Sequence, residues 1–169
     1  MMKIGLGGGC HWCTEAVFES LIGVEKVEQG FIAPKCNASF SEAVIVRFDE
    51  KRIGLSDLIE IHLHTHKSTS EHSMRNKYRS AIYVFDDVVK NASEDIIKAL
   101  QQDFKNELIT KVLYFQDFRA SDIRFQAYYY SKPDRPFCET YISPKLKLLL
   151  HQFSGLVNQK KLNSAHELI

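Results

Sequence analysis

Two apolar segments in the first third of the chain lie too close together for a helix to connect them. The first spans residues 24–31, and the second, EAVIVRF at 42–48, is rich in the β-branched residues that favour strands. Parallel neighbouring strands need a crossover of a dozen or more residues, usually a helix. The short stretch between the two segments therefore argues against a doubly wound parallel sheet.

The rest of the chain alternates between strand and helix patterns. Strands are predicted at 3–8, 80–85 and 111–115, and helices at 12–21, 55–66, 87–105 and 144–157. We expect an α/β fold of the α+β type, a two-layer sandwich with a mixed sheet whose opening βαββαβ portion is ferredoxin-like. The chain is expected to form one domain over 1–169, with 131–169 as a C-terminal tail and closing helix.

Two prolines interrupt the helical pattern before the closing helix. Pro133 and Pro136 are predicted to keep Cys138 in a loop or an extended tail. The last residues, NQKKLNSAHELI, are polar and are expected to fray.

The charges are balanced, with 22 Lys and Arg against 21 Asp and Glu, a net charge of +1. This balance gives no electrostatic case for binding nucleic acid or an anionic membrane. No apolar segment is long enough to span a bilayer, and the first residues make a poor signal peptide, so we expect a cytoplasmic protein. In that reducing compartment the four cysteines are expected to be free thiols, metal ligands or redox groups, not a disulfide framework.

The stretch KIGLGGGCHWC places Cys10 where the first predicted strand turns into a helix. The unpaired amides of a first helical turn and the helix dipole favour a thiolate at that position. His11 would add positive charge when protonated. Cys10 is therefore predicted to be a reactive thiolate, and the alternative is a small cysteine that merely fits beside the glycines.

Cys13 completes a Cys-x-x-Cys pair with Cys10. The pair is either a redox dithiol, in which Cys13 resolves an oxidised Cys10, or half of a zinc site. Trp12, the only tryptophan, either forms the wall of an apolar pocket or belongs to the core. His62 and His66 share a helix face while His64 points elsewhere, and we expect no metal there. Cys36 is interpreted as a loop thiol.

Four segments, in order along the chain, resemble the type A peptide methionine sulfoxide reductases. GGCHWCTEAVFESLIGV is similar to the active-site signature of the family, Gly-Cys-Phe-Trp followed by Gly or Cys. SEAVIVRFDE and NKYRSAIYVFDD are similar to two later strand segments, and KPDRPFCETYISPKLKLL resembles the family's tail. The resemblance covers about residues 3–150.

The resemblance implies a role for several residues. Cys10 matches the nucleophile that attacks the sulfoxide sulfur, Trp12 the wall around the S-methyl group, and Glu42 the carboxyl that protonates the oxygen. Tyr78 matches a tyrosine that hydrogen-bonds that oxygen, and Cys138 matches a tail cysteine that, like Cys13, is a candidate resolving thiol.

The implied activity is thiol-dependent reduction of methionine-S-sulfoxide, peptide-bound or free, as in repair after oxidative stress. A sulfoxide oxygen leaves only when protonated, so a thiolate needs an acid beside it. The attack leaves Cys10 as a sulfenic acid, which condenses with a second thiol to a disulfide. A thioredoxin or similar dithiol then regenerates the enzyme, and no bound cofactor is expected.

Three positions depart from the family pattern. His11 replaces a phenylalanine and is expected to make one pocket wall polar, while Ser73 stands in place of a substrate-site aspartate and Phe125 in place of a histidine. These departures leave alternatives open. The chain could reduce another small sulfoxide or oxidised sulfur compound, act as a dithiol oxidoreductase, or serve as a non-catalytic binding module.

Overall fold

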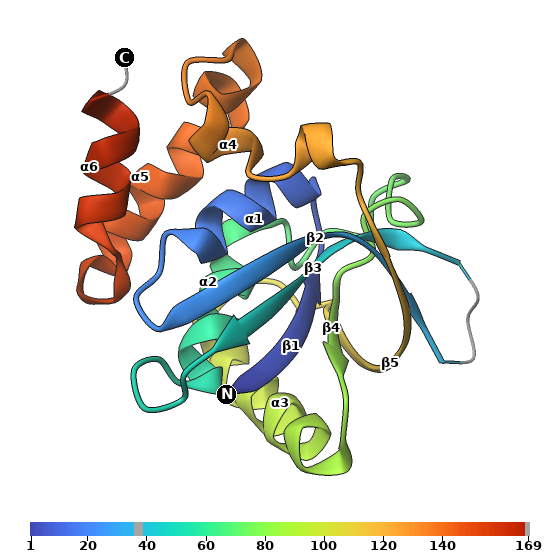
Figure 1. Cartoon of the computed structure of the whole chain (residues 1–169). Helices are drawn as coiled ribbons and strands as arrows, with labels where there is room; N and C mark the ends of the chain where they lie inside the picture. Colours follow the sequence, from blue (N-terminus) through green and yellow to red (C-terminus); the bar gives the residue numbers. More distant parts are fainter. Residues whose placement is uncertain (36–38, 168–169) are drawn as a thin grey trace.

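The computed structural model describes residues 1–35 and 39–167. Its strands are β1 (Met2–Gly7), β2 (Val24–Pro34), β3 (Ser41–Phe48), β4 (Ala81–Val84) and β5 (Lys111–Ala120). Its α-helices are α1 (His11–Glu19), α2 (Leu55–Thr65), α3 (Asp87–Leu100), α4 (Tyr128–Ser131), α5 (Ser143–Gln152) and α6 (Gln159–Glu167) (Figure 1).

The strands form a mixed sheet in the order β1-β3-β2-β5-β4, and the sheet closes into a barrel because β1 also pairs with β4. β2 and β3 pair antiparallel, as their close spacing requires. The one parallel pair in the described chain is β4 with β5, and α3 supplies the crossover between them. The predicted α+β class and mixed sheet are confirmed.

The closure of the sheet differs from the open two-layer, ferredoxin-like arrangement that the sequence predicted. In the structure β4 is only four residues long, yet it pairs with β1 on one edge and β5 on the other. Strand order cannot be read from the pattern of a single strand, since apolar periodicity specifies which face is buried and not which edges are paired.

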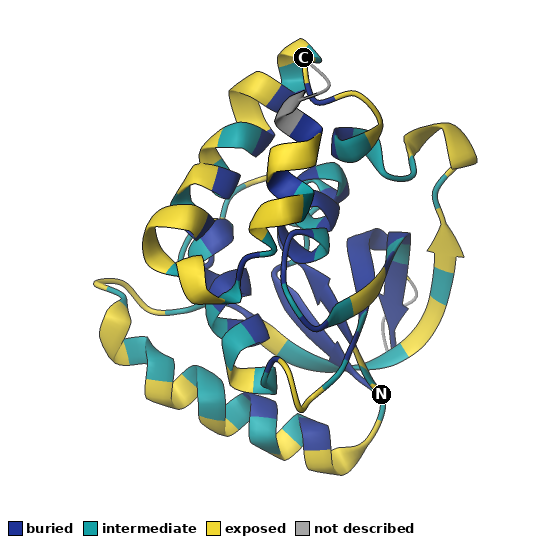
Figure 2. Ribbon diagram, turned by 60° about the vertical axis from the view of Figure 1, so that its left-hand side comes forward, coloured by how far each residue is buried: buried dark blue, intermediate teal, exposed yellow. Residues whose placement is uncertain are grey.

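Alternate side chains of β3 enter two separate cores. Val44 and Val46 belong to the main core beneath α1 and α2, whereas Ala43 and Ile45 belong to a smaller cluster inside the barrel. Gly5 faces that inner cluster, because a Cβ there would lie 2.8 Å from Tyr83 Cβ. Figure 2 shows most strands buried, while β5 is partly exposed.

The C-terminal region is more regular than the sequence predicted. Pro136 begins a helical segment that continues through a π-helix (Cys138–Ile142) into α5, so Cys138 lies in a helix and not in a loop or extended tail. Proline is tolerated in the first turn of a helix, where its missing N–H costs no hydrogen bond. The polar end also forms a helix, α6, which buries Leu162 and Ala165 at 2% exposure.

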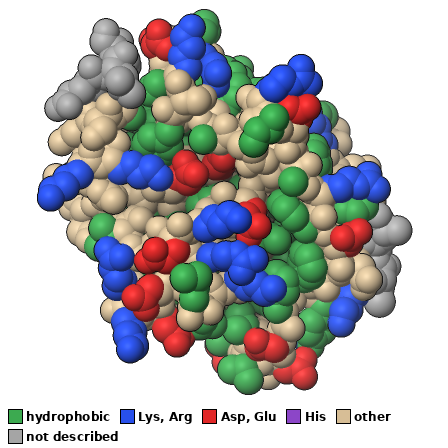
Figure 3. Space-filling model, in the orientation of Figure 1, with side chains coloured by type: hydrophobic (Ala, Val, Ile, Leu, Met, Phe, Trp, Pro, Cys, Tyr) green, Lys and Arg blue, Asp and Glu red, His purple; other side chains and the backbone are tan. Residues whose placement is uncertain are grey.

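Positive and negative side chains are interspersed on the face shown in Figure 3, in keeping with the net charge of +1. Among the described residues, no helix combines the length and the apolar character that a bilayer crossing demands.

Candidate active site

Cys10 lies between β1 and α1, at the residue that caps the amino end of the helix. The amides of Cys13 and Thr14 donate to its carbonyl oxygen at 3.1 and 3.2 Å, so the helix begins immediately after it. A hydrogen bond from the Cys13 side chain and the amides of Trp12 and Cys13 lower the pKa of the Cys10 thiol. These donors outweigh burial and favour a thiolate at Cys10.

Cys13 follows one helical turn later and is only 5% exposed. Its hydrogen bond to Cys10 and its burial raise the pKa of the Cys13 thiol. Cys10 is therefore the thiol of the pair that ionises first. Cys10, Cys13 and Cys138 are all free in the structure, and Cys36 lies outside the described residues.

Lys145, near the start of α5, brings a positive charge to this corner. Its ammonium group donates to the carbonyl oxygen of Thr65. Burial lowers the pKa of Lys145, and the nearby sulfurs of Cys13 and Cys10 oppose that change. Lys145 lies inside the segment KPDRPFCETYISPKLKLL, but no role was predicted for it from the sequence.

Glu42, the second residue of β3, is 7% exposed. Burial raises the pKa of its carboxyl, with partial opposition from Lys77 and the Tyr78 side chain. Its Oε1 atom lies 3.1 Å from His11 Nε2, and its buried Oε2 atom has no hydrogen-bond partner among the described residues. An acid in such surroundings retains its proton at a higher pH than a surface glutamate.

His11 occupies a different place from the one expected. The residue is 4% exposed, and its ring points between β2 and β3, with Nδ1 2.7 Å from the carbonyl oxygen of Gly30. It stands behind Glu42 and is not among the described residues that line the cavity, so it is no part of the pocket wall. The helix start turns the side chain of its first residue inward, which the sequence alone does not specify.

Trp12 lies against an aromatic cluster on one side of the corner. Its ring stacks on Tyr128 at a centroid distance of 4.0 Å and an angle of 8°, and meets Phe137 edge-on at 5.2 Å. Phe125 packs at 5.5 Å from the same ring. Trp12 therefore packs against this aromatic cluster and also lines the cavity described next.

These residues surround a cavity of about 890 Å³. It is lined by Gly8, Gly9, Cys10, Trp12, Cys13, Glu42, His66, Lys67, His72, Met74, Lys77, Tyr78, Phe137, Tyr141 and Lys145. Of the predicted site residues, the structure thus brings together Cys10, Trp12, Cys13, Glu42 and Tyr78.

Ser73 and Cys138 do not appear in that lining as far as the described chain shows. Ser73 is exposed, while its neighbours His72 and Met74 reach the cavity. Cys138 is 0% exposed in the π-helix, and burial raises the pKa of its thiol. Its sulfur lies near enough to act electrostatically on Cys13.

Arg75 organises the loop that carries Tyr78. Its Nη1 donates to the carbonyl oxygens of Gly8 and Tyr78 at 2.8 and 2.9 Å, and Nη2 donates to that of Lys67 at 2.5 Å. Gly8 also lets the His66 ring pack against this backbone, since a Cβ at Gly8 would lie 2.4 Å from that ring. Sequence reasoning missed Arg75, because an arginine in a polar loop is ordinarily solvated.

Glu15 holds a second segment in place on the other side of α1, a role that was not predicted from the sequence. It is 2% exposed and accepts hydrogen bonds from Gln29 Nε2 and from the amides of Ala127 and Tyr128, at 2.5, 2.7 and 3.3 Å. Burial raises its pKa to about 7. These bonds hold Ala127, which has a φ of 50°, and with it the tyrosine that stacks on Trp12.

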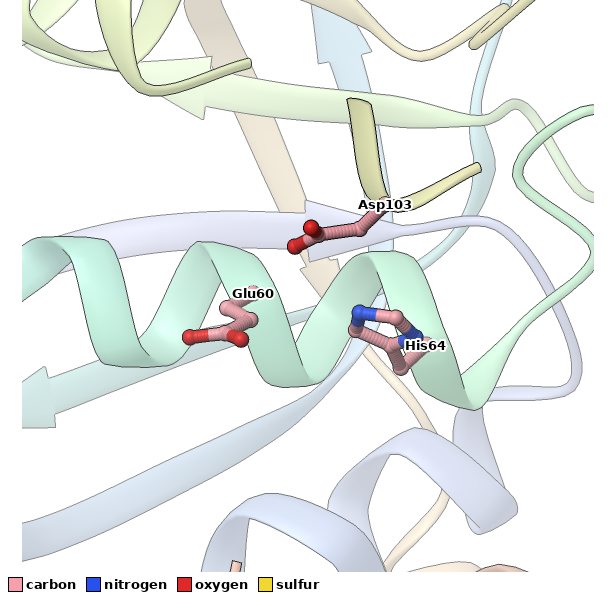
Figure 4. A group of neighbouring side chains, drawn as sticks. All are labelled: Glu60, His64 and Asp103. Atoms are coloured by element: carbon pink, nitrogen blue, oxygen red, sulfur yellow. The ribbon is translucent and has the colours of Figure 1, made fainter. Parts of the chain in front are cut away.

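The helix histidines have separate environments. His62 and His66 bond to the Gly7 carbonyl and the Ser80 hydroxyl, each at 2.8 Å, and burial lowers the pKa of both rings. His64 instead lies with Glu60 and Asp103, with one potential ligand atom from each within 4.8 Å (Figure 4). Exposed carboxylates commonly cluster without an ion, so we assign no metal to this group.

The sequence matches the family model described as peptide methionine sulfoxide reductase over residues 2–155. It is 31% identical to "Peptide methionine sulfoxide reductase MsrA" of Trichodesmium erythraeum, over 92% of this chain and 97% of that protein. It is 32% identical to the MsrA of Campylobacter jejuni, over 87% of this chain and 97% of that protein.

Solved structures show the same fold. Mxr1 of Saccharomyces cerevisiae in reduced form superimposes with a TM-score of 0.73 at 20% identity, over 83% of this chain and 90% of that one. Methionine sulfoxide reductase A of Corynebacterium diphtheriae gives 0.68 at 19% identity, over 78% and 74%. The chain therefore belongs to the peptide methionine sulfoxide reductase family, oxidoreductases that use thiols to reduce methionine-S-sulfoxide.

Proposed function

We propose that Cys10 is the nucleophile and Glu42 the acid of this reduction. The Cys10 thiolate attacks the sulfoxide sulfur while Glu42 delivers one proton to the oxygen. The S–O bond of the substrate breaks, the oxygen passes to Cys10 as a sulfenic acid, and the sulfide leaves. Thiolate, sulfoxide and one proton thus become sulfenic acid and sulfide, and the substrate gains two electrons from Cys10.

One observation carries this proposal: Cys10 and Glu42 line the same cavity and have pKa values shifted in opposite directions. A lowered thiol pKa supplies the nucleophile and a raised carboxyl pKa supplies the acid at the same pH. Tyr78 and the Lys77 ammonium group face the carboxyl and offer donors to the substrate oxygen. Trp12 forms the apolar wall for the methyl group.

We propose Cys13 as the first resolving thiol. Its side chain already contacts Cys10, whereas Cys138 is fully buried in its helix. The Cys13 thiol attacks the sulfenic acid, which yields a disulfide and one water molecule. Cys138 could resolve Cys10 only after the helical segment around it opens.

An external dithiol would reduce this disulfide by exchange. The yeast relative Mxr1 has been solved in complex with Trx2, at a TM-score of 0.60 and 21% identity to this chain. We propose a thioredoxin-like reductant on that analogy, and a cytoplasmic location that would supply it. We also treat residues 1–169 as one reductase domain.

Activity assays with dithiothreitol test the proposal. The enzyme should consume the S epimer of peptide-bound and of free methionine sulfoxide, and the ratio of the two rates identifies the preferred form. Cys10→Ser should be inactive, and Glu42→Gln should lose about 10²- to 10⁴-fold in kcat, the usual contribution of a general acid. Full activity in Glu42→Gln would exclude this carboxyl as the acid.

The resolving thiol is identified by a matched pair of variants. With thioredoxin as reductant, Cys13→Ser should stop after one turnover and Cys138→Ser should continue. Mass mapping of the oxidised enzyme should find the Cys10–Cys13 disulfide. The opposite pattern would assign the role to Cys138.

A further inference from the structure

The hydrogen bond between His11 and Glu42 shows how many protons the two side chains hold between them. The Gly30 carbonyl oxygen, 2.7 Å from His11 Nδ1, can only accept, so Nδ1 carries a hydrogen. His11 Nε2 lies 3.1 Å from Glu42 Oε1. A stable contact at that distance requires one proton between the two atoms, either on the carboxyl or on the imidazole.

Losing that proton would leave two lone pairs facing each other. Both residues are buried, at 4% and 7% exposure, so water cannot enter freely to separate them. The His11 ring is fixed, because it meets Phe31 edge-on at a centroid distance of 5.1 Å. The pair therefore resists deprotonation whichever of the two atoms holds the proton.

The other groups that face the pair act in opposing directions. Lys77 and the Tyr78 side chain favour the carboxylate of Glu42, and Lys77 also disfavours a charged His11. The Cys10 thiolate lies close enough for the two negative charges to repel, which favours a protonated Glu42. His11 contacts the Glu42 carboxyl directly, and it opposes the effect of Lys77 and Tyr78 by keeping a proton on the pair beside the Cys10 thiolate.

We propose that His11 is a positioning residue for the acid: it holds Glu42 through Oε1 and keeps one proton within the pair. When a sulfoxide binds, the carboxyl turns its O–H from His11 Nε2 to the sulfoxide oxygen, and the proton passes to that oxygen. This rests on the proposed role of Glu42 as the acid. The reduction consumes one proton, and the pair holds one. After the transfer the pair is left as carboxylate and neutral imidazole, and it takes a proton from water before the next turnover.

The phenylalanine found in the family pattern gives the matched variant. His11→Phe keeps the ring packing against Phe31 and removes the hydrogen bond to Glu42. The pH profile of kcat/KM should be bell-shaped, with one limb for the Cys10 thiolate and one for the Glu42 acid, the limb that Glu42→Gln removes. In His11→Phe the Glu42 limb should move about one pH unit lower, which means roughly tenfold lower kcat/KM at pH values above both limbs.

Controls separate a proton-holding role from a structural one. Glu42→Gln should lose the limb that belongs to the acid, and in that background a change of His11 should leave the pH profile unaltered. Nitrogen-15 NMR of labelled histidine should show His11 with a protonated Nδ1 throughout, and an Nε2 signal that changes at the pH of the Glu42 limb.

Two results would overturn this inference. One is an active His11→Phe enzyme whose Glu42 limb coincides with that of the wild type. The other is an NMR signal that shows an unprotonated Nδ1 in neutral His11. This measurement uses the wild-type enzyme, so it does not depend on whether the variant folds. Absence of sulfoxide reduction by the wild type at every pH would instead refute the proposed function.

Discussion

Replacement of Glu15 by Gln should change how the stability of the protein depends on pH. Glu15 is buried, and its pKa is raised from 4.5 to about 7 mainly by that burial. Glu15→Gln keeps the shape of the side chain and removes its ionisation. The NH₂ group of the new side chain would face one of the N–H donors that now bond to Glu15, so the variant also loses at least one hydrogen bond. That loss lowers the free energy of unfolding by about 1–3 kcal/mol at every pH.

The sign follows from the proton count. Because the pKa is higher in the folded state, the folded protein binds the Glu15 proton more tightly than the unfolded chain does between pH 4.5 and about 7. Stability from this group is therefore full below pH 4.5, falls as the pH rises through that window, and is constant above it. The whole loss is about 3 kcal/mol, at 1.36 kcal/mol for each tenfold change in proton affinity.

Urea unfolding can measure this difference, with the fluorescence of Trp12, the only tryptophan, as the signal. The free energy of unfolding of the wild type minus that of Glu15→Gln should fall by about 3 kcal/mol between roughly pH 4.5 and 8. The subtraction removes the contributions of other buried groups, such as His62, whose lowered pKa acts in the opposite direction. A difference that stays constant across this range would refute the assignment of a raised pKa to Glu15.

Three further changes test other parts of the site. Lys145→Met removes a cation near the sulfurs, so the pKa of Cys10 should rise and its alkylation by iodoacetamide at neutral pH should slow severalfold; an unchanged rate would exclude the lysine. Gly5→Ala should lower the free energy of unfolding by about 1–3 kcal/mol, because its Cβ would lie 2.8 Å from that of Tyr83. Trp12→Ala should raise KM for a sulfoxide more than it lowers kcat, and the reverse split would place Trp12 in the chemical step.

The strands and the main helices could be predicted because their burial follows simple periods. The segment EAVIVRF predicted β3 with its first residue one position late, and the short connection to β2 predicted the antiparallel pairing. Helix α6 was missed because only Leu162 and Ala165 of its described side chains are buried, too few to show a period. The barrel was missed because its closure depends on which edges of β4 are paired.

The candidate site divides in a similar way. Cys10 could be predicted from local structure alone, since the start of a helix determines the chemistry of its thiol. Glu42 and Tyr78 needed the family resemblance, because a carboxylate at the start of a strand is usually solvated. His11 and Glu15 were misjudged or missed, since only the packing of α1 against β2 decides which way these side chains point.

Closure of the barrel also determines when the reactive corner comes together during synthesis. β1 pairs with β3 on one edge and with β4, at residues 81–83, on the other. A chain growing from a ribosome therefore carries Cys10 and Cys13 directly after a strand with an open edge, until about half of the protein has emerged. Pairing between residues so distant in sequence forms slowly. The nascent thiol pair depends during that interval on the reducing power of its surroundings, and not on its own fold, to avoid premature oxidation.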